Sequence, residues 1–336
     1  MVATFNPWLK GSRPHGDAEP CYQTSGERVG SAGRKAVKSS IDIVEVGARD
    51  GLQNEAAALS VEDRLDFIAR LEACGVRRLE AVSFVNPKRV PQMAGAEEIM
   101  AALPHAAGRS RIGLVLNERG WDRAVAAGVD EANVVVCASD GFGIRNQGAS
   151  VTEQVAAMSA IAARQKAEGG PPLSMTISVA FGCPFDGEVS EDQVVAIARE
   201  AAAAGIGEIA LGDTIGVADP WTVRKRLEAV RKAAPDARLR LHFHNTRNTG
   251  LANAYAGLEG DVDVLDASCG GIGGCPFAPD ATGNIATEDL IYMLDRAGVE
   301  TGLNLGLLIE TGKWVATRLG KAPPSALTRA GVFPKG

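Results

Sequence analysis

The chain has little of several features that mark particular classes of protein. Its 336 residues include only four histidines and six cysteines, and 5% are aromatic. The cysteines are widely scattered and form no CxxC pair: Cys21, Cys74, Cys137, Cys183, Cys269 and Cys275. Secreted disulfide scaffolds need dense cysteine spacing. We therefore expect mostly small buried thiols and a cytoplasmic protein.

Long apolar runs and excess positive charge are also missing. No run approaches the roughly 20 apolar residues needed to cross a bilayer. The formal net charge is -6, whereas nucleic-acid binding needs a concentrated basic face. A hydrophobic fraction of 46% with 23% charged residues is typical of a globular protein. We expect neither a membrane nor a nucleic acid as partner.

The two ends of the chain differ in composition from its middle. Residues 1–40 are rich in Gly, Ser, Pro and Arg and have no helical or strand period, which predicts a flexible N-terminal arm. The arm lacks the apolar core of a secretory signal. Residues 321–336 form a short C-terminal tail.

From Ile41 onward, short β-branched runs alternate with Ala-rich stretches of helical period, as in βαβ units. Ser60 with Asp63, and Ser190 with Gly205, supply helix boundaries. No GxGxxG follows the first strand, which disfavours a dinucleotide-binding fold. The pattern predicts an α/β fold, a (β/α)8 TIM barrel over residues 41–320 with a short C-terminal helical extension. The expected strands are 41–47, 76–83, 111–116, 132–138, 173–180, 207–212, 238–244 and 261–267.

Two of the four histidines lie at the end of the expected seventh strand, in the sequence His242-Phe243-His244. Because side chains alternate along a strand, both imidazoles point to one face and Phe243 to the other. A lone histidine is more often an ordinary core or surface residue. A pair at a barrel strand end favours a shared metal ion.

Charged residues also follow the first two strands. Arg49 and Asp50 come directly after 41–47, where Asp50 can be an oxygen ligand and Arg49 a fixed cation; a surface ion pair in a turn is equally compatible with the spacing. Glu80 interrupts an apolar strand. A charge there is costly unless paired, so we expect Glu80 to accept hydrogen bonds from Arg49 or to orient a ligand.

Two later segments carry further polar side chains at the expected rim. Asp213 and Thr214 follow the sixth strand, where Asp213 could instead simply cap a turn. After the eighth strand, 268–290 holds five glycines, Cys275 and Asn284 and is expected to be a mobile loop, or else a plain connection. Cys275 could donate a proton and Asn284 an amide oxygen. Carboxylate, imidazole and amide donors together suit Mg2+ or Mn2+.

Six segments, in order, resemble the 3-hydroxy-3-methylglutaryl-CoA lyases, part of a superfamily of barrel metallolyases. They are VEVGARDGLQNE, SFVNPKRVPQM, FGCPFDGEV, GDTIGVADP, LHFHNT and GGIGGCPFAPDATGNIATEDL. The resemblance runs from about Ile41 to Gly320. It implies a barrel enzyme that acts on an acyl-CoA thioester and commonly forms dimers or higher homo-oligomers. It also associates the chain with leucine degradation and ketone-body chemistry, and the sequence leaves the pathway open.

The resemblance also assigns roles to individual residues. It implies four metal ligands: Asp50, His242, His244 and Asn284. It implies that Asp213, or His242 through a water, accepts the substrate hydroxyl proton, that Arg49 stabilises the enolate and that Cys275 protonates it. The expected catalytic residues are Arg49, Asp50, Glu80, Asp213, His242 and Cys275. Substrate-binding or supporting roles are expected for Gln53, Ser83, Thr214, Arg247, Glu288 and Asp289.

The chain departs from the family at three places. After the histidine pair it continues Asn245-Thr246-Arg247-Asn248 where Asp-Thr-Tyr-Gly is common, Ala56 replaces a frequent Lys, and Asp280 stands where Gly is usual. Because Arg247 could bind an additional carboxylate, citramalyl-CoA and longer 3-hydroxy-3-alkylglutaryl-CoA thioesters are alternative substrates.

Two other hypotheses are a condensing synthase of the same superfamily and an inactive barrel that only binds ligands. Synthases tend to carry HxHND and a C-terminal extension, whereas this chain ends soon after the barrel. An inactive barrel should have lost a metal ligand, and all four are present.

Overall fold

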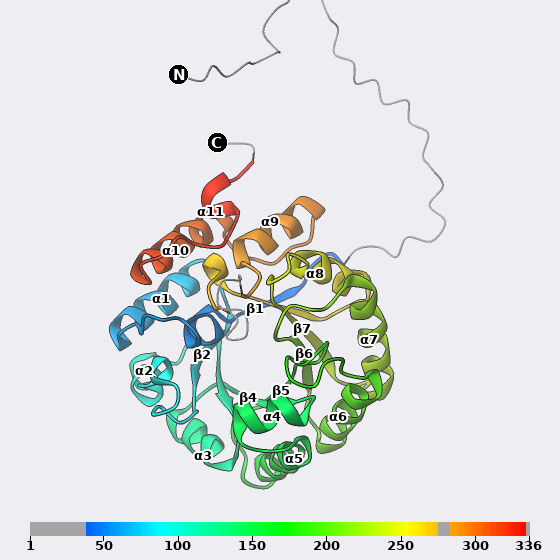
Figure 1. Ribbon diagram of the computed structural model, residues 1–336. Coiled ribbons are helices and arrows are strands. Elements are labelled where there is room, and N and C mark those ends of the chain that lie inside the picture. The colour runs from blue at the N-terminus through cyan, green and yellow to red at the C-terminus, as the bar shows by residue number, and fades with distance from the viewer. Residues whose placement is uncertain (1–37, 275–282, 334–336) are drawn as a thin grey trace, which may run out of the picture. The chain divides into compact units, whose positions relative to one another are not determined.

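A computed structural model describes residues 38–274 and 283–333. Its eight strands form one closed parallel barrel in chain order, and β8 pairs with β1 (Figure 1). The predicted (β/α)8 barrel is confirmed. The strands are β1 (Asp42–Glu45), β2 (Arg78–Ser83), β3 (Ser110–Val115), β4 (Glu131–Cys137), β5 (Leu173–Ser178), β6 (Glu208–Asp213), β7 (Arg238–Phe243) and β8 (Val264–Ala267).

Helices surround the strands as an outer ring (Figure 1). The α-helices are α1 (Val61–Ala73), α2 (Ala96–Ala102), α3 (Glu118–Ala127), α4 (Asp140–Gln147), α5 (Val151–Glu168), α6 (Glu191–Ala204), α7 (Pro220–Ala233), α8 (Gly250–Glu259), α9 (Thr287–Ala297), α10 (Leu305–Arg318) and α11 (Leu327–Ala330). Short helical turns are η1 (Gly47–Gly51), η2 (Pro91–Met93) and η3 (Cys269–Gly271). No described helix is long and apolar enough to span a membrane.

Local sequence signals set the helix boundaries. Ser60 and Ser190 cap α1 and α6 by accepting hydrogen bonds from the backbone of Asp63 and Gln193, which satisfies amides that a helix start leaves unpaired. Gly205 ends α6 with φ +87°, a left-handed conformation that glycine adopts without steric cost. Both predicted helices are therefore present.

Strands β1 and β8 are each three residues shorter than predicted, because neighbouring turns include their ends. Residues 46 and 47 leave β1 to enter the turn η1. Residues 261–263 close α8 instead of starting β8, since the amides of Asp261 and Val262 donate to the carbonyls of Leu258 and Gly257. The pattern of apolar and β-branched residues there does not distinguish the start of a strand from the end of a helix that packs on the barrel.

The barrel has an apolar outside and a partly charged inside. Between strands and helices lie fully buried side chains such as Phe67, Leu71 and Leu227. Inside, Arg78 of β2 makes a bidentate ion pair with Glu208 of β6, with N–O distances of 2.7 Å. Strands β2 and β6 are not neighbours, so this pair crosses the interior, where such barrels usually pack branched apolar side chains.

The described ends of the chain contact the barrel. Lys38–Ser40, which the composition places in the arm, already do so: the Lys38 ammonium donates to the Val262 carbonyl at 2.7 Å, and Ser40 bridges to Glu300. At the other end, the Asp289 carboxylate accepts hydrogen bonds from residues 325–327, which hold α11 against α9. Residues 1–37 of the predicted arm lie outside the described residues.

Candidate active site

A single π-helical turn, η1, places Arg49 and Asp50 at the carboxyl end of β1. The Gly51 amide donates to the Val46 carbonyl at 3.1 Å, closing the wide turn that occurs most often at functional sites. A Cβ on Gly51 would come within 2.7 Å of the Ser268 hydroxyl. The glycine after Arg-Asp is therefore required for the turn to approach the end of β8.

The histidine pair lies beside this turn. The rings of His242 and His244 face the same side of the strand, with centroids 5.2 Å apart, while Phe243 packs against Phe181 outside the barrel. The Nε2 atom of each histidine lies 3.9 Å from Asp50 Oδ2. One ligand atom from each of the three residues falls within 4.8 Å of the others, a spacing that one metal ion can bridge.

Asn284 reaches this group through backbone pairing. The chain returns to the barrel at 283–286, where the Ile285 amide donates to the Phe243 carbonyl at 3.1 Å and Asn284 bridges to His244. The Asn284 side-chain amide donates to Asp50 Oδ2 at 2.8 Å and to the Ile272 carbonyl at 3.2 Å. Among the described residues, the remaining Oδ1 is buried without a hydrogen-bond partner.

Charges in this group shift the pKa of each ionisable member. Burial opposes ionisation of Asp50, but Arg49 and the two imidazoles outweigh it and hold the Asp50 pKa below its ordinary value. Burial, together with the nearby His242, lowers the pKa of His244 to about 4. His242 is also buried, yet its hydrogen bond to Asp266 and the charge of Asp50 raise its pKa.

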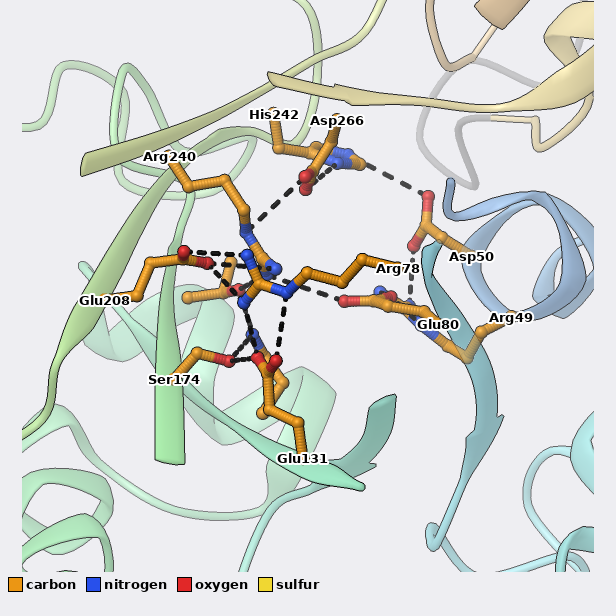
Figure 2. A network of polar contacts seen from close by, with 12 residues as sticks. Arg49, Asp50, Arg78, Glu80, Glu131, Ser174, Glu208, Arg240, His242 and Asp266 are labelled. Atoms are coloured by element: carbon orange, nitrogen blue, oxygen red, sulfur yellow. Dashed lines mark hydrogen bonds and ion pairs between the residues drawn. The ribbon is translucent and has the colours of Figure 1, made fainter. Parts of the chain in front are cut away.

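Arg49 is held between two carboxylates. Its Nε donates to Glu80 Oε2 at 2.6 Å and its Nη1 to Asp50 Oδ1 at 2.7 Å (Figure 2). This is the Arg49–Glu80 pairing expected from a charge in an apolar strand. Burial works against the charge on Arg49, but the two carboxylates more than compensate and raise its pKa. Arg49 is thus a fixed cation whose direction is set by Glu80.

Asp266 of β8 and Arg240 of β7 complete the buried polar group, and the sequence patterns did not single them out. Asp266 Oδ2 lies 3.3 Å from His242 Nδ1, and Arg240 Nε lies 3.4 Å from Asp266 Oδ1 (Figure 2). A sequence signal was available. Arg240, His242 and His244 alternate along one strand, so the Arg240 side chain is expected on the same inner face as the two imidazoles.

A cavity of about 770 Å3 opens over these groups. Of the expected residues, seven line it: Arg49, Asp50, Gln53, Glu80, Thr214, His242 and His244. Asp266 lines it too, as do Asn146 and Gln147 of α4. The extra helix α4 between β4 and α5 was not predicted, and it supplies polar groups to the cavity wall.

Asp213 stabilises the turn that follows β6, which is one of the two roles that the sequence left open. Its two carboxylate oxygens accept the amides of Val217 and Ala218 at 2.8 and 3.1 Å, and it does not line the cavity, although its neighbours Gly212 and Thr214 do. Burial raises the pKa of Asp213 to about 6, against the lowering effect of these amides.

The remaining expected residues lie further from the cavity. Arg247 is exposed and donates to the carbonyls of Ile215 and Gly216, and none of Ser83, Glu288 and Asp289 lines the cavity. Glu288 accepts the Gly270 amide, which fixes η3 beneath the site. Cys275 and Asp280 lie outside the described residues, with most of the glycine-rich segment.

Buried thiols follow the expectation within the described chain. The four cysteines there are free and buried: Cys74, Cys137, Cys183 and Cys269. Burial raises the pKa of Cys137 to about 12 and that of Cys269 well above its ordinary value, so neither is a nucleophile at neutral pH. Cys21, like Cys275, lies outside the described residues.

The cavity mouth is basic although the chain is acidic overall. Lys88 and Arg89 of the β2–α2 loop and Arg119 of α3 line it and are exposed. Within the described residues none of the three has an ion-pair partner within 4 Å, whereas Arg123 beside them pairs with Glu97. These cations remain available to an anionic ligand.

The donor set fits a divalent cation. A carboxylate, two imidazoles and an amide oxygen are ligands that Mg2+ and Mn2+ accept, and the unpartnered, buried Asn284 Oδ1 is a costly feature unless a cation or water satisfies it. Asp50, with its depressed pKa, supplies the negative charge such a cation needs.

Comparison with known proteins identifies the family. The HMGL-like family model matches residues 40–315. The (R)-citramalyl-CoA lyase of Chloroflexus aurantiacus is 43% identical, with 88% of this chain and 96% of that protein covered. The 3-hydroxy-3-isohexenylglutaryl-CoA/hydroxy-methylglutaryl-CoA lyase of Pseudomonas aeruginosa is 39% identical, with 86% and 96% covered.

A solved structure agrees with these relatives. The HMG-CoA lyase from Acinetobacter baumannii, in complex with coenzyme A and 3-methylmalate, superposes with a TM-score of 0.85 at 35% identity, and the match covers 90% of this chain and 98% of that one. The resemblance drawn from the six sequence segments is thereby confirmed, and the chain belongs to the HMGL-like family of barrel lyases.

Proposed function

We propose that this protein cleaves 3-hydroxy-3-methylglutaryl-CoA to acetoacetate and acetyl-CoA with the help of a divalent metal ion. The observation that carries the proposal is the convergence of Asp50, His242, His244 and the unpartnered Asn284 Oδ1 at the rim of one barrel. Arg49 lies next to this group as a fixed cation. The relatives at 39% and 43% identity are both lyases of acyl-CoA thioesters.

The four residues would hold Mg2+ or Mn2+, which when bound supplies Lewis-acid polarisation of the substrate's hydroxyl and carboxylate oxygens. The protein's own contribution is positioning. Asn284 orients Asp50, and Glu80 orients Arg49, so both charges are in place before substrate binds.

Three proton and charge steps are assigned to side chains. We assign the hydroxyl proton to Asp213, which lies between the cavity-lining residues Gly212 and Thr214 and whose pKa of about 6 suits a base near neutral pH. Each Asp213 oxygen accepts one turn amide and keeps a second lone pair. The bond between C2 and C3 then breaks: C3 becomes the ketone of acetoacetate, and the electron pair forms the acetyl-CoA enolate, which Arg49 stabilises. Protonation of C2, assigned to Cys275, completes acetyl-CoA.

The alternative base is His242 acting through a water. Its Nδ1 already faces Asp266, which leaves Nε2 as the only atom for both metal binding and proton transfer. We therefore favour Asp213. An Asp213→Asn variant that retained wild-type kcat would transfer this role to His242.

The basic mouth of the cavity supports coenzyme A as the carrier. Coenzyme A bears a diphosphate and a further phosphate, and Lys88, Arg89 and Arg119 offer unpaired charge at the same opening. A barrel interior that holds the acyl group and a basic rim that holds the nucleotide fit one extended thioester.

Two related substrates remain candidates, each favoured by one observation. The relative at 43% identity acts on (R)-citramalyl-CoA, whose acyl chain is one carbon shorter. The relative at 39% identity also takes 3-hydroxy-3-isohexenylglutaryl-CoA, and a cavity of about 770 Å3 has room for a longer substituent.

A thioester panel tests the proposal. Purified protein reconstituted with Mn2+ is given each of the three substrates, and acetyl-CoA is quantified together with acetoacetate, pyruvate or the longer oxo acid. We expect the highest kcat/KM with 3-hydroxy-3-methylglutaryl-CoA. A higher value with citramalyl-CoA would reassign the substrate, and net condensation of acetyl-CoA with an oxo acid would indicate a synthase. A cytoplasmic location and a homo-oligomeric state remain predictions from the sequence.

A further inference from the structure

Six side chains of the site form a closed ring of polar contacts, in which His242 Nε2 and Asp50 face each other across the proposed metal position (Figure 2). Around the ring they are Arg240, Asp266, His242, Asp50, Arg49 and Glu80. The N–O distances run from 2.6 Å for Arg49–Glu80 to 3.9 Å for His242–Asp50. One half of the ring carries metal ligands and the other half carries Arg49.

Arg240 closes this ring from below. Its side chain is fully buried, and its three nitrogens each face a different carboxylate: Nε lies 3.4 Å from Asp266, Nη2 3.6 Å from Glu80 and Nη1 3.5 Å from Glu208. A planar guanidinium presents its donors in a rigid fork, whereas a lysine ammonium is a compact charge on a flexible stem.

Asp266 determines which nitrogen of His242 is free. An ionised carboxylate only accepts hydrogen bonds, so His242 Nδ1, 3.3 Å away, must carry the proton. Nε2 then presents its lone pair toward Asp50. His244 has no such partner in the part of the chain that the structure describes, where its Nδ1 is buried without a hydrogen bond. Asp266 therefore fixes the tautomer of His242 but not that of His244.

Stability alone does not account for the arrangement. Taking three carboxylates and a guanidinium out of water costs more than packing apolar side chains of equal volume. The lower part of the barrel already holds a compact ion-pair group, in which Arg78 binds Glu131 and Glu208 at 2.7 Å. Arg240 instead extends this group upward to Glu80 and Asp266, the two carboxylates that orient Arg49 and His242.

We propose that Arg240 and Asp266 are positioning residues. Asp266 fixes the metal-binding tautomer of His242, and Arg240 holds Asp266 and Glu80 in their relative positions. One buried cation thereby determines the orientation of both His242 and Arg49. This rests on the proposed function for the identity of the metal site. It adds two residues outside the proposed ligand set, of which Asp266 contacts His242 at Nδ1 and not at the proposed ligand atom Nε2.

The test is metal affinity measured without substrate. Metal-free protein is titrated with Mn2+ and free ion is followed by electron paramagnetic resonance. Asp266→Asn keeps the shape of the side chain but can donate to Nδ1 and favour the other tautomer, so we expect Kd for Mn2+ to rise roughly 10- to 100-fold. Glu131→Gln is the matched control, because Glu131 is equally a buried barrel carboxylate but bonds Arg78 outside the ring.

A nitrogen NMR spectrum adds a readout that a structural role would not move. The chain has only four histidines, so the ring nitrogens of His242 can be resolved in 15N-histidine protein. We expect one tautomer, protonated at Nδ1, in the wild type and its loss in Asp266→Asn. Unchanged Kd and unchanged tautomer in a folded Asp266→Asn would overturn the proposal.

Arg240→Lys provides a second variant if Asp266→Asn does not fold. It keeps the buried charge and loses the fork that contacts three carboxylates. We expect weaker Mn2+ binding together with lower kcat; a lower Tm with unchanged Kd and kcat would contradict the proposal. Failure of the wild type to bind Mn2+ would instead reject the proposed function, so the two outcomes are distinguishable.

Discussion

Asn284 donates its side-chain amide to Asp50 at 2.8 Å, although 234 positions separate the two residues in the chain. The contact uses Nδ2, and the Asn284 carbonyl oxygen is buried with no hydrogen-bond partner among the described residues. Two of the proposed metal ligands are thus oriented by one hydrogen bond between them. The first prediction concerns this bond.

Asn284→Ala should weaken Mn2+ binding by roughly 10- to 100-fold, because it removes a ligand oxygen and the donor that orients Asp50. Titration calorimetry on metal-free protein measures the effect. Asn253→Ala is the control: Asn253 is a buried asparagine of α8 that donates to the Ala218 carbonyl and does not line the cavity. Equal affinities in the two variants would remove Asn284 from the metal site.

Arg49→Met should leave Mn2+ affinity little changed and lower kcat by roughly 10²- to 10³-fold, since it removes the cation that stabilises the enolate. The loss also removes the Arg49 partner of the buried Glu80 carboxylate, so Tm should fall. In the double variant Arg49→Met/Glu80→Gln we expect Tm to recover while kcat stays low. A single variant with wild-type kcat would exclude Arg49 from the chemistry.

Replacing Lys88 and Arg89 together by glutamine should raise KM for the CoA thioester by roughly 3- to 10-fold at low salt, with kcat nearly constant, because exposed charges contribute modest binding in ground and transition states alike. The effect should shrink as ionic strength rises. Arg224→Gln, an exposed change on α7 outside the cavity, should alter neither constant. A drop in kcat with constant KM would place the two residues elsewhere in the mechanism.

Glu45 predicts a specific pH dependence of stability. It accepts the amides of Gly47 and Cys269 and the Thr287 hydroxyl, and its complete burial raises its pKa from 4.5 to about 7. Between these values the folded protein binds more protons than the unfolded chain, so the free energy of unfolding falls as pH rises through that window.

Glu45→Gln should therefore flatten the decrease of Tm between pH 5 and pH 8, by an amount equivalent to on the order of 2 kcal/mol. Thermal melts at matched ionic strength measure it. Glu288, whose burial likewise raises its pKa to about 7, keeps part of the slope in the variant. Glu62→Gln, at an exposed position of α1, is the control, and parallel curves for all three proteins would contradict the assignment.

The alternation of strand and helix patterns was sufficient to predict the barrel. The alternation of side chains along a strand was sufficient to predict that the two histidines face the same side. Both signals are local periodicities. Glu80 was also predictable, since a charge in an apolar strand needs a partner. Asn284 was less predictable. Its position offered an amide oxygen, but its place beside the histidines depends on the backbone bond from Ile285 to Phe243, which no local pattern encodes, and the family resemblance implied its role as a ligand.

Arg240 and Asp266 were missed for a different reason. A charged side chain in a strand such as RLRLHFH is ordinarily interpreted as facing solvent. Closure of the barrel places that face of the strand in the interior. Asp213 shows the opposite case: a residue expected at the site also accepts the amides of its own turn, with one lone pair of each carboxylate oxygen. Local sequence gives the residue types, while barrel closure decides which of them meet.

The most direct test of the proposed metal-dependent cleavage is a single assay on protein stripped with EDTA. 3-Hydroxy-3-methylglutaryl-CoA is supplied with and without added Mn2+, and acetoacetate and acetyl-CoA are quantified together. We predict no turnover without metal and equimolar release of both products once Mn2+ is restored. Full activity in the stripped protein, or release of acetyl-CoA without acetoacetate, would contradict the account.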